Sequence, residues 1–167
     1  LSKVFVNSLS PVEVAHRFIR SLIRKGDLCI DATVGNGHDT IFLAEQVGEK
    51  GKVLGFDVQS SAIESTRTAL VKNQLAARVQ LFELGHETLG AELSEEEKGC
   101  LKLVVFNLGY LPGSDKSVVT QSQSTQQALE QSLVNLQPDG AISLVAYRGH
   151  AGGNAECAAV EAWVDQL

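Results

Sequence analysis

A glycine-containing stretch in the first quarter of the chain combines residue types that can hold a small ligand. It runs Asp31-Ala32-Thr33-Val34-Gly35-Asn36-Gly37-His38-Asp39-Thr40. Glycines at 35 and 37 let the backbone adopt positive φ and let a ligand approach the chain closely. The helix expected to follow offers free N–H groups to a carboxylate or phosphate. Asp57, 20 residues after Gly37, is placed to accept both hydroxyls of a ribose. The pattern predicts a nucleoside site. Its plain alternative is a tight turn with Asp57 as a helix cap.

The type of nucleoside is indicated by position 40. Turns that bind dinucleotides need a third glycine there, and this chain has Thr40. S-adenosylmethionine has no pyrophosphate and needs groups for its amino-acid end instead. Asp31 suits the ammonium group, and Thr40 with the helix N-terminus suits the carboxylate. We therefore expect S-adenosyl-L-methionine as the cofactor, and regard a nicotinamide-dependent oxidoreductase as the weaker alternative.

The same stretch resembles the first motif of class I S-adenosylmethionine-dependent methyltransferases, which runs acid, x, Gly, x, Gly, x, Gly. Asp31, Gly35 and Gly37 keep that spacing, and Thr33 replaces the first glycine. The resemblance implies that the turn cradles the methionyl part of the cofactor and that two pairs of later residues hold its nucleoside. The cofactor-binding residues expected on this basis are Asp31, Gly35, Asn36, Gly37, Asp39 and Thr40, with Asp57 and Gln59 at the ribose and His86 and Glu87 at the adenine.

A second stretch lies at the end of a strand expected at 101–107. It runs Asn107-Leu108-Gly109-Tyr110-Leu111-Pro112-Gly113 and resembles the Asn/Asp-Pro-Pro-Tyr motif of amino-group methyltransferases, with Leu108-Gly109 replacing the prolines. The Asn107 amide oxygen and the Leu108 carbonyl could accept N–H bonds from an amine and orient its lone pair. Tyr110 would stack on the substrate base or wall it. The alternative is a strand end followed by a turn.

Together with Gly149-His150-Ala151-Gly152-Gly153, these motifs resemble those of the rRNA methylase family, small bacterial proteins with plant relatives. The resemblance implies N-methylation of the aminomethyl group of 5-aminomethyl-2-thiouridine at the tRNA wobble position. An alkylammonium cannot attack a methyl group, so the amine must first lose its proton. Asp115 and His150 are the candidates for that role. The alternatives are a methyltransferase acting on rRNA or another amine, and a non-catalytic cofactor-binding module.

The elements that must position these residues alternate along the chain. Strands are expected at 28–33, 52–57, 78–84, 101–107 and 140–146, and helices at 11–25, 38–47, 60–74, 121–136 and 153–166. This rhythm indicates right-handed βαβ units. It predicts an α/β fold of the Rossmann-like, doubly wound type, with a mainly parallel sheet in a three-layer αβα arrangement. Residues 1–167 are expected to form a single methyltransferase domain that lacks the antiparallel hairpin ending the standard fold.

Composition limits the partners. Fourteen Lys and Arg against 20 Asp and Glu give a net charge of −6, the opposite of a protein that coats nucleic acid. Residues 1–30 nevertheless carry a net charge of +3, which leaves room for a small basic face around Arg17, Arg20 and Arg24. We expect a tRNA or rRNA substrate, no membrane association, no metal, and a homodimer as one way to complete the sheet edge. Three widely spaced cysteines indicate a reducing compartment, by default the cytoplasm.

Overall fold

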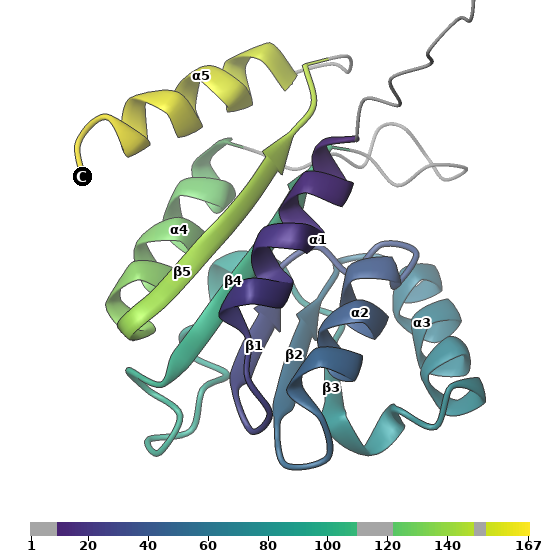
Figure 1. The fold of residues 1–167 in the computed structure, drawn as a ribbon. Helices are drawn as coiled ribbons and strands as arrows, with labels where there is room; N and C mark the ends of the chain where they lie inside the picture. The colour runs from purple at the N-terminus through teal and green to yellow at the C-terminus, as the bar shows by residue number, and fades with distance from the viewer. Residues whose placement is uncertain (1–9, 110–121, 149–152) are drawn as a thin grey trace, which may run out of the picture.

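The computed structural model describes residues 10–109, 122–148 and 153–167. Five strands form one sheet in the order β3-β2-β1-β4-β5 (Figure 1), and every neighbouring pair is parallel. The strands are β1 (Leu28–Asp31), β2 (Lys52–Phe56), β3 (Val79–Phe82), β4 (Leu101–Leu108) and β5 (Leu136–Ala146). The predicted doubly wound parallel sheet is confirmed. The direction of the strand order reverses between β1 and β4, the place where open α/β sheets bind ligands.

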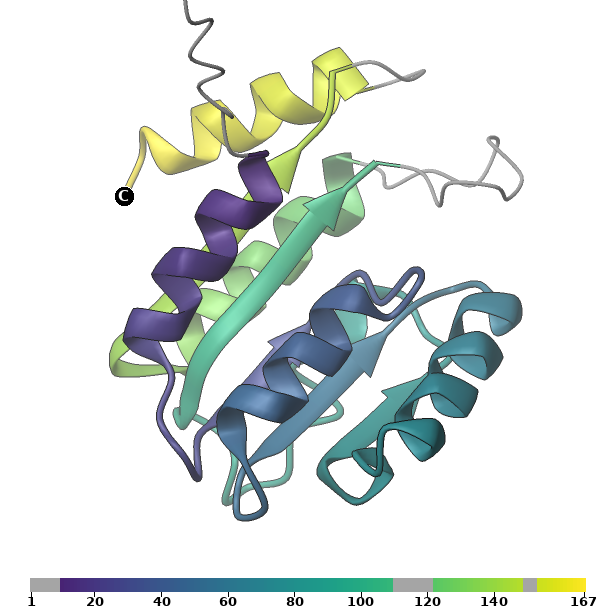
Figure 2. The ribbon, with the colours of Figure 1, turned by 45° about the vertical axis from the view of Figure 1, so that its right-hand side comes forward.

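Helices cover both faces of the sheet, as the three-layer prediction requires. Figure 2 shows α1, α2 and α3 on one face and α4 behind β4 and β5. The helices are α1 (Pro11–Leu22), α2 (His38–Val47), α3 (Ser60–Lys72), α4 (Ser122–Asn135) and α5 (Gly153–Val164). Short 3₁₀ turns, η1 (Ala76–Arg78) and η2 (His86–Thr88), lie before and after β3. No helix within the described ranges is long and apolar enough to cross a membrane.

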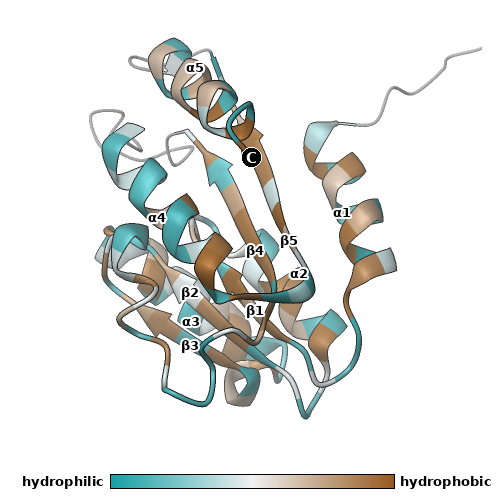
Figure 3. Cartoon of the chain, turned by 90° about the vertical axis from the view of Figure 1, so that its left-hand side faces the viewer, coloured by the Kyte–Doolittle hydropathy of each residue, from teal (hydrophilic) through white to brown (hydrophobic). Residues whose placement is uncertain are grey.

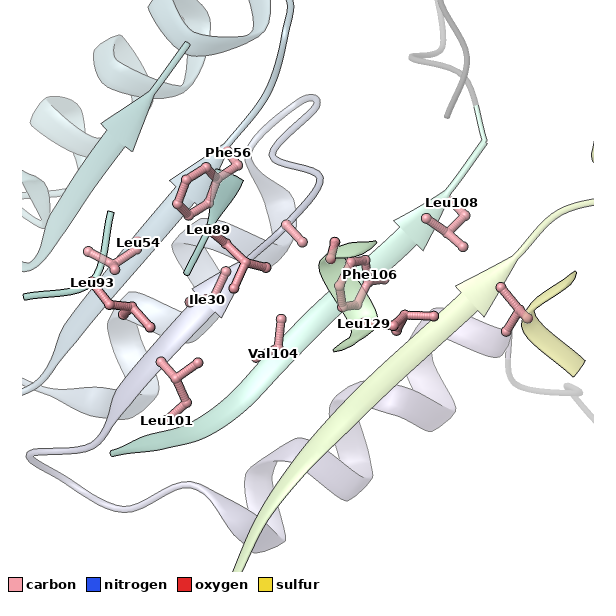
Figure 4. Packing of buried hydrophobic residues seen from close by; sticks show 13 residues of the cluster. Ile30, Leu54, Phe56, Leu89, Leu93, Leu101, Val104, Phe106, Leu108 and Leu129 are labelled. Atoms are coloured by element: carbon pink, nitrogen blue, oxygen red, sulfur yellow. The ribbon is translucent and has the colours of Figure 1, made fainter. Parts of the chain in front are cut away.

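Alternating strand residues supply two separate cores, because a parallel sheet is buried on both faces. Ile30, Leu54 and Val104 belong to one cluster, which Ala128 and Leu129 of α4 complete (Figure 4). Cys29, Val53 and Leu103 face the opposite way and pack with Ile19 of α1 and residues of α2 and α3; the helical members besides Ile19 are Phe42, Leu43, Ala44, Val47 and Leu70. Figure 3 shows the apolar colouring concentrated along the strands and a polar outer surface on α4. The sheet is therefore held rigidly from both sides beneath its carboxyl edge.

Strand β5 differs from its predicted range. It begins at Leu136, directly after α4, whereas Pro138-Asp139-Gly140 predicts a turn and a start at residue 140. The extra residues form a bulge: Leu101 pairs with Leu136, but Leu103 pairs with Ala141. Lys102 is buried at this point and its Nζ donates to the backbone oxygen and carboxylate of Asp139 at 2.9 and 2.6 Å. This contact lets a proline and a glycine remain inside a strand.

Helix α1 has a complete start signal. Ser10 accepts a hydrogen bond from the Glu13 N–H at 3.2 Å, and the Ser10 N–H donates to the Glu13 carboxylate at 2.7 Å. Pro11 occupies the first helical position. This capping box fixes the beginning of the helix one turn before His16, a residue that reaches the carboxyl edge of the sheet.

Candidate functional site

The turn between β1 and α2 requires glycine at two positions. Gly35 and Gly37 have φ values of +50° and +77°, and the Gly37 N–H donates to the Val34 carbonyl at 2.8 Å. A Cβ atom on Gly37 would lie 2.5 Å from the Thr66 hydroxyl oxygen of α3. The turn therefore packs closely against α3 and leaves Asn36 exposed at its tip. Helix α2 begins at His38, directly after Gly37, so its free N–H groups face the carboxyl edge of the sheet.

Asp57 ties the ends of β1 and β2 together. Its carboxylate accepts hydrogen bonds from the Gly35 N–H at 2.8 Å and from the Gln59 N–H at 2.9 Å. The side chain is half-buried. Each carboxylate oxygen can accept more than one hydrogen bond, so Asp57 keeps acceptor capacity toward the edge of the sheet. The sequence-predicted turn and acid thus lie in direct contact.

Asp31 is fully buried and is used inside the protein. Its carboxylate accepts from the Thr33 N–H at 3.1 Å and from the Thr40 hydroxyl at 2.5 Å. Burial, and next to it the charge of Asp39, raises the pKa of Asp31 to about 7. In this structure the Asp31 and Thr40 side chains have no exposed surface and hold the turn to the first helical residues. Their direct contacts with a ligand stay predictions.

Thr33 has a function that the motif comparison alone does not reveal. Its hydroxyl oxygen accepts the Asn107 backbone N–H at 2.8 Å, which joins the turn after β1 to the end of β4. The glycine of the motif could not make this bond. A hydroxyl residue at a glycine position was the signal in the sequence.

In the Asn107 side chain, the amide nitrogen has a hydrogen-bond partner among the described residues and the amide oxygen has none. Its Nδ2 is 3.4 Å from Asp39 Oδ2, whereas Oδ1 is buried and has no hydrogen-bond partner among the described residues. Asp39 also contacts His16 of α1, with 2.5 Å between His16 Nε2 and Asp39 Oδ1. The Leu108 carbonyl already accepts the Tyr147 N–H at 3.2 Å. Sequence reasoning missed His16, because nothing in its spacing links it to a residue 23 positions later.

His86 is buried, whereas its neighbour Glu87 is exposed. The His86 ring meets the Phe106 ring edge-on at 5.8 Å between centroids, and Nδ1 lies 3.2 Å from the Ala32 carbonyl oxygen. Burial lowers the pKa of His86, which favours the neutral ring. A neutral ring whose Nδ1 faces a carbonyl must carry its proton there. Nε2 is then an acceptor, and it is buried without a partner among the described residues.

Three predicted catalytic residues lie outside the described residues: Tyr110 and Asp115 follow the range that ends at Gly109, and His150 follows the range that ends at Arg148. Arg148 pairs with Glu161 of α5 at 2.5 Å. No group of three or more His, Cys, Asp or Glu side chains that could hold a metal occurs in the part of the chain that the structure describes. The described site is thus a glycine turn, three aspartates and two buried acceptor atoms without a partner among the described residues, all at one edge of the sheet.

The chain matches one family model and several known proteins. Residues 53–167 match the family described as Putative rRNA methylase. A chloroplastic tRNA (mnm(5)s(2)U34)-methyltransferase of Arabidopsis thaliana is 42% identical over 98% of this chain and 63% of the relative. A tRNA adenine N(1)-methyltransferase of Methanocaldococcus jannaschii is 29% identical over 62% of this chain and 35% of the relative. The chain thus spans less than two thirds of the length of these curated relatives.

Solved structures give the same grouping. A protein described as a putative rRNA-methylase from Clostridium thermocellum superposes with a TM-score of 0.91 at 36% identity, covering 97% of this chain and 85% of that one. A protein from Streptococcus mutans that is described as a putative methyltransferase, and was solved in complex with SAH, superposes with a TM-score of 0.84 at 36% identity, covering 96% of this chain and 84% of that one.

Proposed function

The chain belongs to the rRNA methylase family, and from this premise we propose that it is an S-adenosylmethionine-dependent N-methyltransferase. One observation carries the proposal. The buried oxygen of Asn107, which has no hydrogen-bond partner among the described residues, lies at the end of β4, and the Asn107 backbone is tied through Thr33 to the glycine turn that precedes α2. A cofactor-binding turn and an acceptor for an amine N–H are therefore joined by one hydrogen bond.

The residues present fit the cofactor. The turn at 35–37 and the start of α2 would hold its amino-acid end, and Asp57 with Gln59 would hold its ribose. His86 Nε2, an acceptor without a partner among the described residues, suits the exocyclic amine of an adenine, and exposed Glu87 would border the adenine. When bound, the cofactor supplies a methyl group on a positively charged sulfur.

The chain's own part in the reaction is to position the amine. Asn107 Oδ1 accepts one N–H of the neutral amine and so directs the lone pair away from itself. The Leu108 carbonyl, which already accepts the Tyr147 N–H, has a second lone pair for another N–H. Removal of the proton from the ammonium form is assigned to Asp115 or His150. Tyr110 would stack on the substrate nucleobase or line its pocket. These three roles are inferred from the sequence resemblance.

The substrate we propose is the aminomethyl group of 5-aminomethyl-2-thiouridine at the tRNA wobble position. Support comes from the plant relative, which matches nearly the whole chain and is described as a tRNA methyltransferase of that nucleoside. An rRNA amine is the second candidate, favoured by the family description. A reducing compartment, by default the cytoplasm, agrees with the free thiols of Cys29, Cys100 and Cys157. We also propose a homodimer, and light scattering measures the molar mass that tests it.

The substrate is tested by mass spectrometry of nucleosides. Purified protein is incubated with S-adenosylmethionine and tRNA carrying the unmethylated aminomethyl base, then the RNA is digested. We expect the mass of that nucleoside to rise by one methyl group, and we expect no change in tRNA that lacks the aminomethyl group. Asn107→Ala should lower the rate by about a hundredfold or more. Methylation of rRNA instead would select the second candidate, and a fully active Asn107→Ala protein would disprove the role of Asn107.

The cofactor site is tested by calorimetry with S-adenosylhomocysteine. Asp57→Ala removes the proposed ribose acceptor and should weaken binding by about tenfold to a hundredfold, because hydrogen bonds to charged groups contribute roughly 1.5–3 kcal/mol. Glu64→Ala, an exposed carboxylate on α3, is the matched control and should bind normally. Circular dichroism checks that both variants are folded. Unchanged affinity in folded Asp57→Ala would disprove the ribose assignment, and heat with NAD would favour the oxidoreductase.

A further inference from the structure

We propose that His16 and Asp39 are positioning residues that fix the orientation of the Asn107 amide, so that its oxygen, and not its nitrogen, is presented to the substrate amine. The inference rests on the proposed amine methylation and deepens it. It brings helix α1, which no motif of the sequence includes, into the site.

The first step is the fixed position of the His16 ring. The ring stacks on Phe42 of α2, with 3.9 Å between the ring centroids and 6° between the ring planes. Its Nε2 lies 2.5 Å from Asp39 Oδ1, and both side chains are largely buried, with exposures of 21% and 12%. The Phe42 stack and the carboxylate contact come from one helix, since Asp39 and Phe42 are three positions apart on α2. Helix α1 is therefore docked onto α2 through this histidine.

The second step is the direction of the hydrogen bonds. An ionised carboxylate only accepts, so His16 Nε2 must carry a proton and donate it to Asp39 Oδ1. The other oxygen of Asp39 remains as an acceptor and lies 3.4 Å from Asn107 Nδ2. Asp39 thus faces a donor on each side.

The third step is the consequence for Asn107. If its amide were turned by 180°, Oδ1 would face the Asp39 oxygen with no proton between the two acceptors. Because 3.4 Å is longer than the usual 2.7–3.2 Å, the bond to Nδ2 is weak, and repulsion in the turned state supplies most of the preference. The Asn107 backbone is held separately by the Thr33 hydroxyl. Only one orientation of the amide is then favourable.

The fourth step is the state of Oδ1 itself. This oxygen is buried and without a partner in the described part of the chain, and buried acceptors are nearly always satisfied in folded proteins. A narrow cleft beside the Asn107 residue is lined by Val12, His16, Asp39, Asn107 and Val145 among others. An acceptor kept unpaired and aimed by a neighbouring carboxylate is what an incoming amine donor requires.

The orientation is tested without substrate by NMR of ¹⁵N-labelled protein. The side-chain NH₂ signals of Asn107 are assigned by their loss in Asn107→Asp. We expect the Asp39→Ala and His16→Phe variants to shift these signals and to speed their exchange with water, by about threefold or more. His16→Phe preserves the stack on Phe42 while removing the donor. Arg17→Gln, at the next position of α1, is the control and should leave the signals unchanged. Unchanged Asn107 signals in folded Asp39→Ala would overturn the proposal.

The functional consequence is tested by exchanging the two side chains, with S-adenosylmethionine and tRNA carrying the aminomethyl base as substrates. Asn107→Asp alone opposes two carboxylates and should lower kcat by about a hundredfold. The double variant Asn107→Asp with Asp39→Asn restores one donor and one acceptor. It should regain at least about a tenth of the wild-type kcat when S-adenosylmethionine is saturating, so that any change in cofactor affinity does not affect the comparison. A double variant no more active than Asn107→Asp alone would overturn the proposal. Failure of the wild type to methylate this tRNA would instead refute the proposed substrate, while the NMR result still decides the orientation.

Discussion

Two aspartates at the ends of neighbouring strands have different environments and therefore different uses. Asp57 is half-buried, holds two backbone N–H groups, and keeps acceptor capacity toward the site. Asp31 is fully buried among the turn residues, where desolvation disfavours its charge. The same residue type is thus the proposed ligand acceptor in one place and a brace of the turn in the other.

The buried carboxyl predicts a pH dependence of stability. The pKa of Asp31 is raised to about 7, first by burial and then by the charge of Asp39. Because the folded pKa lies above the unfolded value, this carboxyl stabilises the fold fully below about pH 4, and the contribution is lost as the pH rises through about 7. Asp31→Asn can still accept from Thr33 and donate to Thr40, but it does not titrate.

We therefore expect the free energy of unfolding of Asp31→Asn, relative to wild type, to increase by roughly 2–4 kcal/mol between pH 4 and pH 8. Urea unfolding at a series of pH values measures this difference. Asp165→Asn, an exposed position near the end of α5, is the control and should show no such trend above pH 5. A difference between Asp31→Asn and wild type that is constant with pH would contradict the buried titration.

Among the elements, the turn after β1 is held from three sides. Asp57 binds it from β2, Thr33 connects it to β4, and Thr66 of α3 packs against Gly37. A loop fixed in this way needs no rearrangement to present its backbone to a ligand, which lowers the entropic cost of binding.

The close contact with α3 gives a prediction for glycine replacement. Gly37→Ala forces an L side chain into φ +77° and places Cβ 2.5 Å from the Thr66 hydroxyl. Gly26→Ala is the matched control, because Gly26 has φ +99° but no atom within 4 Å of its Cβ position. We expect a cost of about 1–2 kcal/mol for Gly26→Ala from conformation alone, and about 1–3 kcal/mol more for Gly37→Ala from overpacking.

Urea unfolding measures both costs, and a second substitution identifies the cause. Thr66→Ala removes the hydroxyl that the new Cβ would meet, so Gly37→Ala should cost less in a Thr66→Ala background than in wild type. Equal costs at Gly37 and Gly26, or no relief from Thr66→Ala, would show that α3 does not constrain the turn.

At the scale of the whole molecule, the parallel sheet could be predicted because its signal is local. Strands buried on both faces give short apolar runs such as Leu103-Val104-Val105-Phe106, and glycines at required turns are visible in the sequence. The start of β5 could not be predicted, because Pro138 and Gly140 normally break a strand and the Lys102–Asp139 contact that accommodates them joins residues 37 positions apart.

The candidate site shows the same contrast between features that are local in the sequence and contacts that form only in the folded chain. The positions of Gly35, Gly37 and Asp57 could be predicted from spacing and that of Asn107 from a motif resemblance, because each lies at the end of a predicted strand or in the turn after it. The contact of His16 with Asp39 depends on how α1 docks on α2, and side-chain packing between helices leaves no regular spacing in the sequence. Only the folded structure brings that pair to Asn107.

The proposed RNA substrate would have to be bound through a local basic surface, because the chain carries a net charge of −6. Helix α1 presents Arg17 and Arg20 at exposed positions, exposed Arg24 follows just after the helix ends, and His16 of the same helix reaches the site. Arg20 is partly engaged, since its guanidinium carbon lies 5.0 Å from the centroid of the Phe42 ring. These three cations either contact phosphates of the bound RNA or form a solvated face.

The salt dependence of tRNA binding distinguishes the two. Each phosphate contact contributes about 0.7–0.9 to the slope of log K against log salt concentration, so a few contacts give a slope of about −2 to −3 for wild type. If α1 and the residues just after it border the bound RNA, replacing Arg17, Arg20 and Arg24 by Gln should bring the slope about 2 units closer to zero. The control replaces three exposed cations on other elements: Lys50, which precedes β2, and Arg67 and Lys72 of α3. Both triple variants carry the same net charge, so any long-range attraction to the RNA changes equally in both. Counterion release depends on contact with phosphates, so only the variant at Arg17, Arg20 and Arg24 should change the slope. Equal slopes for the two variants would mean that α1 is a solvated face and that the RNA is held elsewhere.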